Sequence, residues 1–430
     1  MTTTAELWAA PVADRPLDAW VDVPGSKSLT NRYLVLAALA DGVGRVRGAL
    51  ASRDTLLMAD ALTRLGAAVE RDGTDWSVTP LPVPGPSSEP VRIDCGLAGT
   101  VMRFLPAVAA LQARPVLLDG DPEARVRPMG PVLHALRDLG AVVEDGGRGT
   151  LPVTVTGPPR MLGGPVDVDA SVSSQFVSGL LLAGARFENG LLLRHTGRTL
   201  PSLPHIQMTV EVLRDAGVSV DDSRPYIWEV LPGPIAAREV RVEPDLSNAA
   251  PFLCAALVAG GTVRVPGWPE RTTQPGALLP DLLTTMGGSV RREGDALAVS
   301  GTGVVHGIDV DLHEAGELAP TIAALAVLAD SPTRLRGIGH IRGHETDRLA
   351  ALATEITRVG GQAEQTHDGL VITPRELHGA VWESYHDHRM ATAGALVGLR
   401  VPGLEVVDIG TTAKTLPDFV GMWTGMLAGA

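Results

Sequence analysis

Apolar residues in this chain fall into segments of two kinds. The segment 34–40 reads Leu-Val-Leu-Ala-Ala-Leu-Ala and is apolar on every side, whereas segment 132–143 places His134, Arg137 and Asp138 among apolar residues at helical spacing. A helix that is apolar all round belongs in the interior, and one with a single apolar stripe lies on the surface. The pattern therefore predicts buried helices alternating with outer helices.

This alternation occurs six times. The buried segments, each followed by a β-rich run and a glycine, are 33–48, 104–120, 176–197, 252–267, 321–337 and 390–410; the outer segments are 55–69, 132–143, 207–220, 278–290, 347–363 and 416–427. The closing glycines lie 72, 77, 70, 70 and 73 positions apart, and such a period marks a duplicated supersecondary unit. We predict an α/β protein of six modules. Because 430 residues exceed one ordinary core, we expect the modules to divide three and three between two domains.

Lysine is almost absent from the composition. Of 36 basic residues only Lys27 and Lys414 are lysines, so 36 − 2 = 34 are arginines. Lysine carries a compact, strongly hydrated charge that arginine does not reproduce, so these two positions are candidates for chemistry. A compositional drift toward arginine would leave its survivors on exposed helix faces. Instead they lie in the Gly- and Ser/Thr-containing segments 24–28 and 410–415.

The remaining totals exclude several classes of protein. A net charge of −13 argues against a partner held by nucleic-acid phosphates or anionic lipid. Two cysteines, Cys95 and Cys254, make no disulfide framework. The first ten residues lack the basic and then apolar order of a signal peptide, and no apolar run approaches the roughly 18 residues of a membrane span. We expect a cytoplasmic protein without a membrane or nucleic-acid partner.

Cap residues and cations precede the predicted buried helices. The segments are 26–28, 99–100, 173–175, 245–247, 316–317 and 387–389. Capping alone explains Ser, Thr, Asp and Gly there. Lys27, Arg103, Arg127, Arg389 and Lys414, however, stand near N-terminal ends of helices, where a cation opposes the helix dipole and needs an anion. Backbone donors, hydroxyls and cations together predict a site for a ligand with several negative charges.

Three other interpretations fit the sequence less well. A phosphate-binding P-loop needs Gly directly before its Lys, and Ser26 stands there. His386 and His388 would share one face of a strand and could begin a metal site, but no further ligand spacing completes it, so we predict no metal. A ring-shaped DNA clamp also repeats α/β modules, yet it needs basic channel helices, and residues 176–185 carry no charge.

The motifs resemble those of the enolpyruvyl transferases, and among them the EPSP synthase family. They occur in family order over the whole chain: Pro-Gly-Ser-Lys-Ser-Leu-Thr-Asn-Arg at 24–32, Ala-Gly-Thr-Val-Met-Arg at 98–103, Arg-Pro-Met-Gly at 127–130, Ser-Ser-Gln-Phe at 173–176, Glu-Thr-Asp-Arg-Leu at 345–349, Asp-His-Arg-Met-Ala at 387–391 and Thr-Ala-Lys-Thr at 412–415. The resemblance implies two similar domains, each of three βαβαββ-type units, with the active site in the interdomain cleft. One domain would span residues 23–241, and the other would combine residues 1–22 with 242–430.

The resemblance also implies the reaction. Phosphoenolpyruvate would give its enolpyruvyl group to the 5-hydroxyl of 3-phosphoshikimate and release phosphate, a step of the shikimate pathway to chorismate and the aromatic amino acids. No cofactor is implied, and we expect a monomer. Residues expected to hold 3-phosphoshikimate are Lys27, Ser28, Arg32, Ser173, Ser174, Gln175, Ser202, Glu317 and His344. Those expected to hold phosphoenolpyruvate are Lys27, Gly99, Arg127, Gln175, Arg348, Arg389 and Lys414.

Two proton transfers are needed, one from the hydroxyl and one to the methylene carbon of phosphoenolpyruvate. By its motif position Glu317 fits the base that takes the hydroxyl proton. Glu345 fits the acid, with Lys27 and His388 as possible helpers, and the sequence does not rank these three. Gly99 leaves room beside the expected phosphoenolpyruvate site, so we also expect sensitivity to the family inhibitor glyphosate.

Some positions depart from the family pattern. Glu317 stands where Asp is usual, and His344 where Lys is usual; His340, His205 and Leu97 replace Asn, Tyr and Asn. The nearest alternative is a UDP-N-acetylglucosamine enolpyruvyl transferase, but that relative usually has Asn after its first Lys and a Cys before its Arg-Pro motif. Neither occurs here. A binding protein on an inactive scaffold of this kind is disfavoured, because both candidate carboxylates are present.

Overall fold

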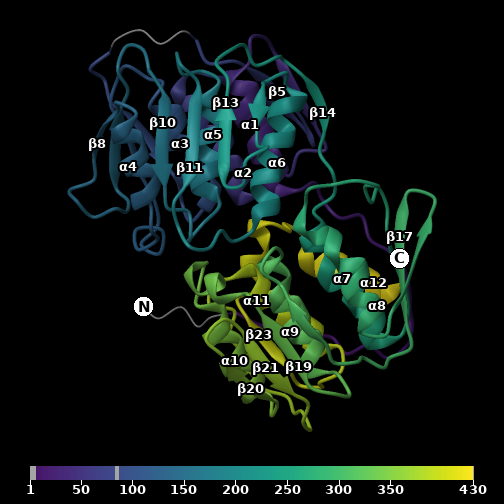
Figure 1. The fold of residues 1–430 in the computed structure, drawn as a ribbon. Coiled ribbons are helices and arrows are strands. Elements are labelled where there is room, and N and C mark those ends of the chain that lie inside the picture. Colours follow the sequence, from purple (N-terminus) through teal and green to yellow (C-terminus); the bar gives the residue numbers. More distant parts are fainter. Residues whose placement is uncertain (1–5, 83–86, 430) are drawn as a thin grey trace. The chain divides into compact units, whose positions relative to one another are not determined.

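The computed structural model describes residues 6–82 and 87–429, so residues 1–5 of the predicted second domain lie outside the described residues. The chain divides into two compact units. We call Gly25–Val242 the N-terminal unit, and Met1–Pro24 together with Glu243–Ala430 the C-terminal unit. Each unit has its own hydrophobic core. Figure 1 colours the first in purple to teal and most of the second in green to yellow.

The predicted repetition is confirmed by the sheets. In the N-terminal unit the strand orders are β14-β3-β5-β4, β6-β7-β9-β8 and β10-β11-β13-β12. These strands are β3 (Gly44–Arg47), β4 (Ala68–Asp72), β5 (Asp75–Thr79), β6 (Val91–Asp94), β7 (Val116–Asp119), β8 (Val142–Glu144), β9 (Val153–Thr156), β10 (Gly164–Val168), β11 (Leu191–His195), β12 (Val220–Asp221), β13 (Ile227–Val230) and β14 (Glu239–Arg241). Each sheet pairs its first two strands in parallel and the rest antiparallel.

The C-terminal unit repeats this order twice and shortens it once. Its sheets are β16-β17-β15-β2, β18-β19-β21-β20 and the three-stranded β1-β23-β22. The strands are β1 (Leu7–Ala9), β2 (Leu17–Trp20), β15 (Gly261–Val265), β16 (Ser289–Glu293), β17 (Ala296–Gly301), β18 (Asp309–Asp311), β19 (Thr333–Arg336), β20 (Gln362–Gln365), β21 (Leu370–Thr373), β22 (Val381–Trp382) and β23 (Glu405–Val407). In the last sheet the N-terminal strand β1 pairs antiparallel with β23 and takes the place of the usual hairpin.

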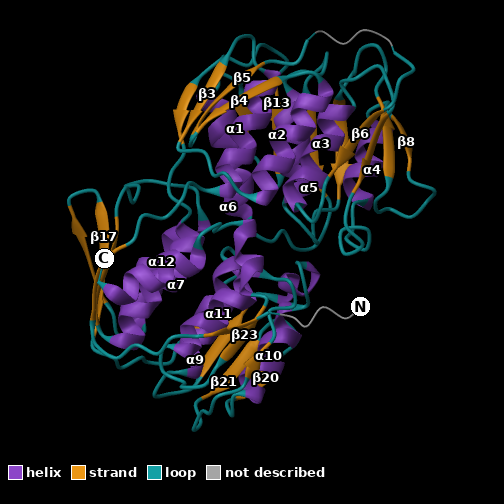
Figure 2. Ribbon diagram, turned by 180° about the vertical axis from the view of Figure 1, so that it is seen from behind, coloured by secondary structure: helices purple, strands orange, loops and turns teal. Residues whose placement is uncertain are grey.

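The predicted division into buried and outer helices is also confirmed. The buried helices are α1 (Lys27–Leu39), α3 (Gly99–Ala109), α5 (Gln175–Gly184), α7 (Leu246–Ala259), α9 (Ala319–Val327) and α11 (His388–Gly398). The outer helices are α2 (Arg53–Leu65), α4 (Gly130–Asp138), α6 (Leu203–Asp215), α8 (Leu279–Thr285), α10 (Arg348–Arg358) and α12 (Phe419–Ala428). Within the N-terminal unit α3 packs on α5, and within the C-terminal unit α9 packs on α11. Figure 2 shows the helices of each unit against its strands.

Side-chain caps begin three of the buried helices. Ser26 accepts a hydrogen bond from Leu29 N at the start of α1, Asp245 accepts from Asn248 N at α7, and Asp387 accepts from Arg389 N at α11. Such caps satisfy backbone donors that the helix itself leaves open. Within residues 6–82 and 87–429, no helix is long and apolar enough to cross a membrane.

One sequence prediction about this region is wrong. His386 and His388 do not share the face of a strand, because His386 has a positive φ of 55° in a turn and His388 is the first residue of α11. His386 is itself a central residue of the turn that Ser384 and Asp387 close. The two histidine side chains consequently find different partners, Asp408 for His386 and Glu345 for His388.

Candidate active site

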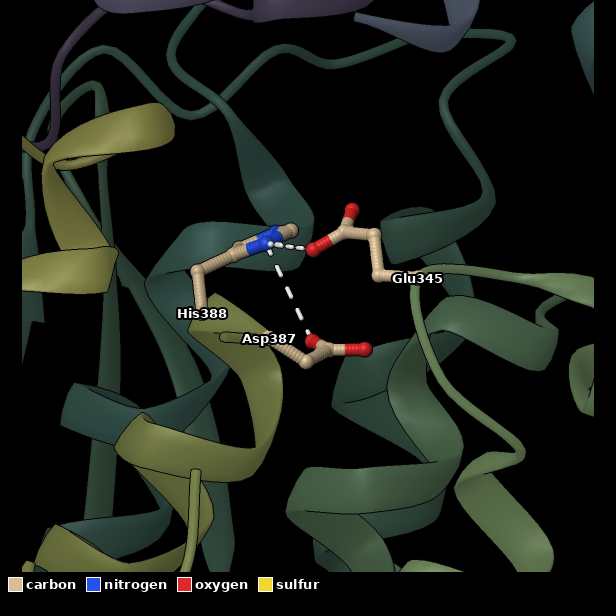
Figure 3. Close-up of side chains that lie close together, drawn as sticks. All are labelled: Glu345, Asp387 and His388. Carbon is tan, nitrogen blue, oxygen red and sulfur yellow. Dashed lines mark hydrogen bonds and ion pairs between the residues drawn. The ribbon is translucent and has the colours of Figure 1, made fainter. Parts of the chain in front are cut away.

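Glu345 lies at the centre of a buried charge cluster in the C-terminal unit. Its Oε1 is 2.7 Å from Nζ of Lys414, and its Oε2 is 3.0 Å from Nδ1 of His388. All three side chains are less than a tenth exposed. Figure 3 shows Glu345 facing His388 and Asp387, which come from the start of α11. Lys414 ends the short 3₁₀ helix Ile409–Lys414, which packs against α11.

The charge states of this cluster follow from its contacts. Burial alone would raise the pKa of Glu345, but Lys414, His388 and Arg348 together hold it well below its ordinary value. Burial lowers the pKa of His388, and the neighbouring Glu345 offsets only part of that effect. At neutral pH the carboxylate is therefore ionised and the imidazole neutral, with its Nδ1–H donating to Glu345.

A second ion pair fixes Arg348, the first residue of α10. Its Nε and Nη2 donate to the two carboxylate oxygens of Asp387 at 2.7 and 3.0 Å, and its Nη1 donates to Nδ1 of His344 at 3.0 Å. Burial alone would lower the pKa of Arg348, yet Asp387, Glu345 and Glu317 raise it. The guanidinium thus stays charged and carries a two-point contact with a rigid partner.

Arg389 is a buried cation in a less favourable position. Burial and the nearby charge of Arg348 lower its pKa, although Asp245, Glu317 and Asp387 offset part of the effect. Its Nη1 donates to the carbonyl of Ser247 at 3.3 Å. A buried cation whose charged form is disfavoured gains free energy when an anion arrives. Arg389 is thus suited to bind one.

Glu317 and two histidines lie in the same unit. Glu317 belongs to the 3₁₀ helix Gly316–Leu318, and its charge acts on His340, Arg348 and Arg389. Burial lowers the pKa of His340 to about 4, so this ring is neutral. The rings of His340 and His344 lie 5.9 Å apart. The structure therefore brings Glu317, the predicted base, among the same charges as Arg348 and Arg389.

Three donor atoms, one each from Glu345, Asp387 and His388, lie within 4.8 Å of one another, the spacing of a metal site. Sequence spacing missed this group, because Glu345 is 43 residues from His388. Both carboxylates are already paired with cations, Glu345 with Lys414 and Asp387 with Arg348. A divalent ion would have to enter against these charges, so the donor set fits a salt-bridge network better than a metal.

Lys27 stands at the start of α1 in the N-terminal unit. Its Nζ is 3.1 Å from Oδ2 of Asp54, a residue of α2 that is 1% exposed, while the lysine side chain keeps 19% exposure. The lysine is therefore held by a buried carboxylate and still reaches solvent. Sequence reasoning missed Asp54, since nothing along the chain links it to a lysine 27 positions earlier.

Gly99, Arg127 and Gln175 are neighbours in the N-terminal unit. A methyl group on Gly99 would lie 3.0 Å from Nη2 of Arg127 and 3.1 Å from Oε1 of Gln175. Arg127 donates to the carbonyl of Leu97, and the buried Arg103 donates to Oε1 of Gln175 at 2.9 Å. Burial and the charge of Arg127 hold the pKa of Arg103 well below its ordinary value. Two neighbouring cations, one of them with a lowered pKa, again favour a bound anion.

Arg32 is more deeply placed than the sequence suggested. It is 1% exposed, and its three nitrogens donate to Ser28 O, Thr209 Oγ1, Ser178 Oγ and His205 O, at 2.8–3.3 Å. Burial lowers its pKa to about 9. The guanidinium thus ties α1 to α5 and α6.

The predicted serines surround the starts of helices in this unit. Ser173 Oγ accepts from Gln175 N at 3.3 Å, and Ser174 is the N-cap of α5. Ser202 is the N-cap of α6 and has a positive φ of 53°, a conformation that non-glycine residues rarely adopt. Neither N-cap side chain bonds its own helix, which leaves the Ser174 and Ser202 hydroxyls to other partners.

Comparison with known proteins identifies the family. The sequence profile of "EPSP synthase (3-phosphoshikimate 1-carboxyvinyltransferase)" matches residues 12–423. The chain belongs to the EPSP synthase family. A curated 3-phosphoshikimate 1-carboxyvinyltransferase from Kocuria rhizophila is 55% identical over 430 residues, covering 98% of this chain and 97% of that relative. The chain is accordingly an enzyme of the transferase class.

Solved structures agree with membership of the EPSP synthase family. The EPSP synthase of Acinetobacter baumannii superposes with a TM-score of 0.80 at 25% identity, covering 98% of each chain. The enolpyruvyl transferase NikO of Streptomyces tendae reaches a TM-score of 0.76 at 20% identity, again over 98% of each chain, and supports the fold alone. The alternative assignment to a UDP-N-acetylglucosamine transferase is not favoured by the family profile or by the curated relative.

Proposed function

We propose that the enzyme transfers the enolpyruvyl group of phosphoenolpyruvate to the 5-hydroxyl of 3-phosphoshikimate, giving 5-enolpyruvylshikimate 3-phosphate and phosphate. The observation that carries the proposal is the ionised Glu345, held between Lys414 and His388 in the unit that also carries Arg348 and Arg389. Both substrates are polyanions, and such buried cations gain from binding them. Membership of the EPSP synthase family supports the same reaction.

We assign the binding of phosphoenolpyruvate to cations of both units. Arg127, Arg348 and Arg389 suit its carboxylate and phosphate through paired N–H donors, and Lys27 and Lys414 serve single oxygens as point charges. Gly99 and Gln175 border Arg127 and would limit the room for the three-carbon chain. The burial of Arg389 supports this assignment, because burial lowers the pKa of its guanidinium and a bound anion would raise that pKa again.

We assign 3-phosphoshikimate to polar side chains at the helix starts of the N-terminal unit. Ser173, Ser174, Ser202 and Ser28 offer hydroxyls there, and Gln175 offers an amide. Arg32 and Lys27 add positive charge, and Glu317 and His344 of the C-terminal unit complete the set. Hydroxyls and backbone donors at helix N-termini are suited to phosphate oxygens.

The chemistry is an addition followed by an elimination. Glu317 takes the proton of the 5-hydroxyl as its oxygen attacks C2 of phosphoenolpyruvate, while C3 gains a proton and becomes a methyl group. The resulting tetrahedral intermediate then breaks the C2–O bond to phosphate, and C3 loses a proton to restore the double bond. Cations around the phosphate stabilise the leaving group as its negative charge grows.

Glu345 must acquire the proton that it delivers to C3. Its low pKa means that it carries none at rest, and Lys414 lies 2.7 Å from its Oε1. We assign Lys414 as the source, with Glu345 passing the proton on; the return of the proton in the elimination step follows the same route reversed. His388 keeps Glu345 oriented through the Nδ1–H contact at 3.0 Å.

Further expectations accompany this proposal. We take the two compact units to be the two domains of the family, and we expect the enzyme to act as a monomer in the cytoplasm without a cofactor. Sensitivity to glyphosate is expected from Gly99. Sedimentation tests the monomeric state, cell fractionation tests the location, and an inhibition assay tests the sensitivity to glyphosate.

Phosphate release tests the reaction. Purified enzyme is given phosphoenolpyruvate with 3-phosphoshikimate or with UDP-N-acetylglucosamine, and we expect release with the first acceptor only. Glu317→Gln should lower kcat by about 10²–10⁴-fold, the usual worth of a general base. Glu314→Gln, at an exposed position three residues away, is the matched control and should keep wild-type turnover. Release with the sugar nucleotide alone would overturn the proposal.

A further inference from the structure

The segment that precedes the Asp387-His388-Arg389 motif is held in an unusual backbone conformation. Tyr385 and His386 both have φ of 55°, and the amide of Asp387 donates to the carbonyl of Ser384 at 2.9 Å. These are the marks of a tight turn with positive φ at both central positions, which Asn and Gly normally occupy. Tyrosine has no such preference. The surrounding structure must therefore hold the turn in place.

Glu355 is the group that meets this turn. It lies on α10 and is 0% exposed, and its Oε1 accepts a 2.6 Å hydrogen bond from the hydroxyl of Tyr385. Its Oε2 accepts from the amide of Glu383 at 3.0 Å and pairs with Arg358 at 2.7 Å. Burial raises the pKa of Glu355 despite these donors. A buried carboxylate that the proposed reaction does not use is costly, so a role in holding the turn accounts for its presence.

The same helix reaches the segment at two points. Arg348 and Glu355 are seven residues apart, about two turns, and so lie on one face of α10. Arg348 binds Asp387 through both carboxylate oxygens, and Glu355 binds Tyr385 and the amide of Glu383. Figure 1 shows α10, β23 and α11 within the C-terminal unit. One face of α10 thus binds the segment both before the turn, at Glu383, and after it, at Asp387.

The turn is also linked to the segment that carries Lys414. Nδ1 of His386 lies 3.1 Å from Oδ2 of Asp408, the residue that precedes the 3₁₀ helix ending at Lys414. Asp408 itself has a positive φ of 50°. Both side chains of this pair are well exposed, so the contact is weaker than those of Glu355. It nevertheless joins two backbone positions with positive φ, one in the turn before His388 and one at the start of the 3₁₀ helix that ends at Lys414.

We propose that Glu355 is a positioning residue, which holds the Tyr385–His386 turn in its left-handed conformation and thereby fixes His388 and Arg389 for phosphoenolpyruvate. This inference rests on the proposed function for its kinetic readout. It assigns Glu355 no contact with substrate. Loss of Glu355 should leave the contacts of the N-terminal unit with 3-phosphoshikimate in place and weaken the use of phosphoenolpyruvate.

Kinetics of four variants test the proposal. Tyr385→Phe removes one hydroxyl and should raise KM for phosphoenolpyruvate about fivefold, as for the loss of one ordinary hydrogen bond. Glu355→Ala should raise it at least about tenfold, and Glu355→Gln, which keeps an acceptor, should recover most of that loss. KM for 3-phosphoshikimate should change less than about twofold in each. Exposed Glu376→Gln in the same unit is the control.

The positive φ of Tyr385 allows a decisive comparison of Glu355→Ala with and without a second substitution at Tyr385. Asparagine adopts positive φ more readily than tyrosine, so Tyr385→Asn should form the turn without help from Glu355. In that background Glu355→Ala should raise KM for phosphoenolpyruvate less than about twofold. An undiminished effect of Glu355→Ala there, or equal increases in KM for both substrates, overturns the proposal.

Amide exchange separates this proposal from the assigned reaction. The amides of Asp387 and Arg389 are hydrogen-bonded to Ser384 O and Asp387 Oδ1, and they should exchange faster with deuterium in Glu355→Ala and in Tyr385→Phe. This measurement needs no turnover. If the wild-type enzyme fails to release phosphate, the proposed function is lost while exchange still reports the turn. If exchange in the variants equals that of wild type, Glu355 does not hold the turn.

Discussion

Replacing Glu345 by glutamine tests the buried charge cluster most directly. The variant keeps the shape of the side chain and removes its charge. Lys414, whose side chain is only 6% exposed, then faces a neutral amide. Removing one partner of a buried ion pair costs about 3–5 kcal/mol. Because the amide oxygen still accepts from Lys414, we expect the lower end, about 3 kcal/mol at pH 7. For a unit of this size that corresponds to a Tm lower by roughly 6–12 °C.

The pH dependence of this difference has a definite sign. The pKa of Glu345 is depressed in the folded enzyme, so its contribution to stability is complete above the unfolded value of about 4.3 and is lost as pH falls through the folded value. The gap between wild type and Glu345→Gln should therefore be constant from pH 7 to 5. By pH 3.5 it should shrink by about 1 kcal/mol.

Denaturant unfolding at several pH values measures this gap. The exposed Glu376→Gln serves as control and should unfold like wild type throughout. The same Glu345→Gln preparation should lose about 10²–10⁴-fold in kcat, as for an acid in the reaction. A gap below about 1 kcal/mol at pH 7, or one that grows as pH falls to 3.5, would refute the description of Glu345 as an ionised, stabilising member of the cluster.

Two further predictions concern the proposed contacts with phosphoenolpyruvate. Lys27→Arg and Lys414→Arg keep the charge but not the compact ammonium, so each should lower kcat/KM for phosphoenolpyruvate at least about tenfold. The exposed Arg334→Lys is the control and should leave kcat/KM unchanged. Wild-type kinetics in either lysine variant would mean that the scarcity of lysine is only compositional at that position. Gly99→Ala places a methyl group 3.0 Å from Nη2 of Arg127. It should raise both KM for phosphoenolpyruvate and the half-inhibitory concentration of glyphosate. Gly130→Ala, where a methyl group would have no neighbour within 4 Å, should leave both quantities unchanged.

The period of the sequence determined the architecture. Six alternations of all-round apolar and one-sided apolar segments correspond to six buried and six outer helices among residues 6–82 and 87–429, because burial depends on which faces of a helix are apolar. Helix caps could also be predicted, because Ser26, Asp245 and Asp387 accept hydrogen bonds from backbone amides within three residues of themselves. Family motifs then placed the candidate residues, including Glu345, His388 and Lys414.

Contacts between distant positions were decided only by tertiary structure. Asp54 meets Lys27 and Glu355 meets Tyr385 across 27 and 30 positions, and no local pattern marks either carboxylate. The turn at Tyr385–His386 was misread as a strand, since its residues lack the Asn or Gly that announces positive φ. Charge states also depend on burial: Glu345 is ionised and His388 neutral because packing removes water and sets Lys414 beside the carboxylate. The sequence thus determined which helices are buried and which residues are available for chemistry. Only the tertiary structure decided which side chains these residues contact and whether they are protonated.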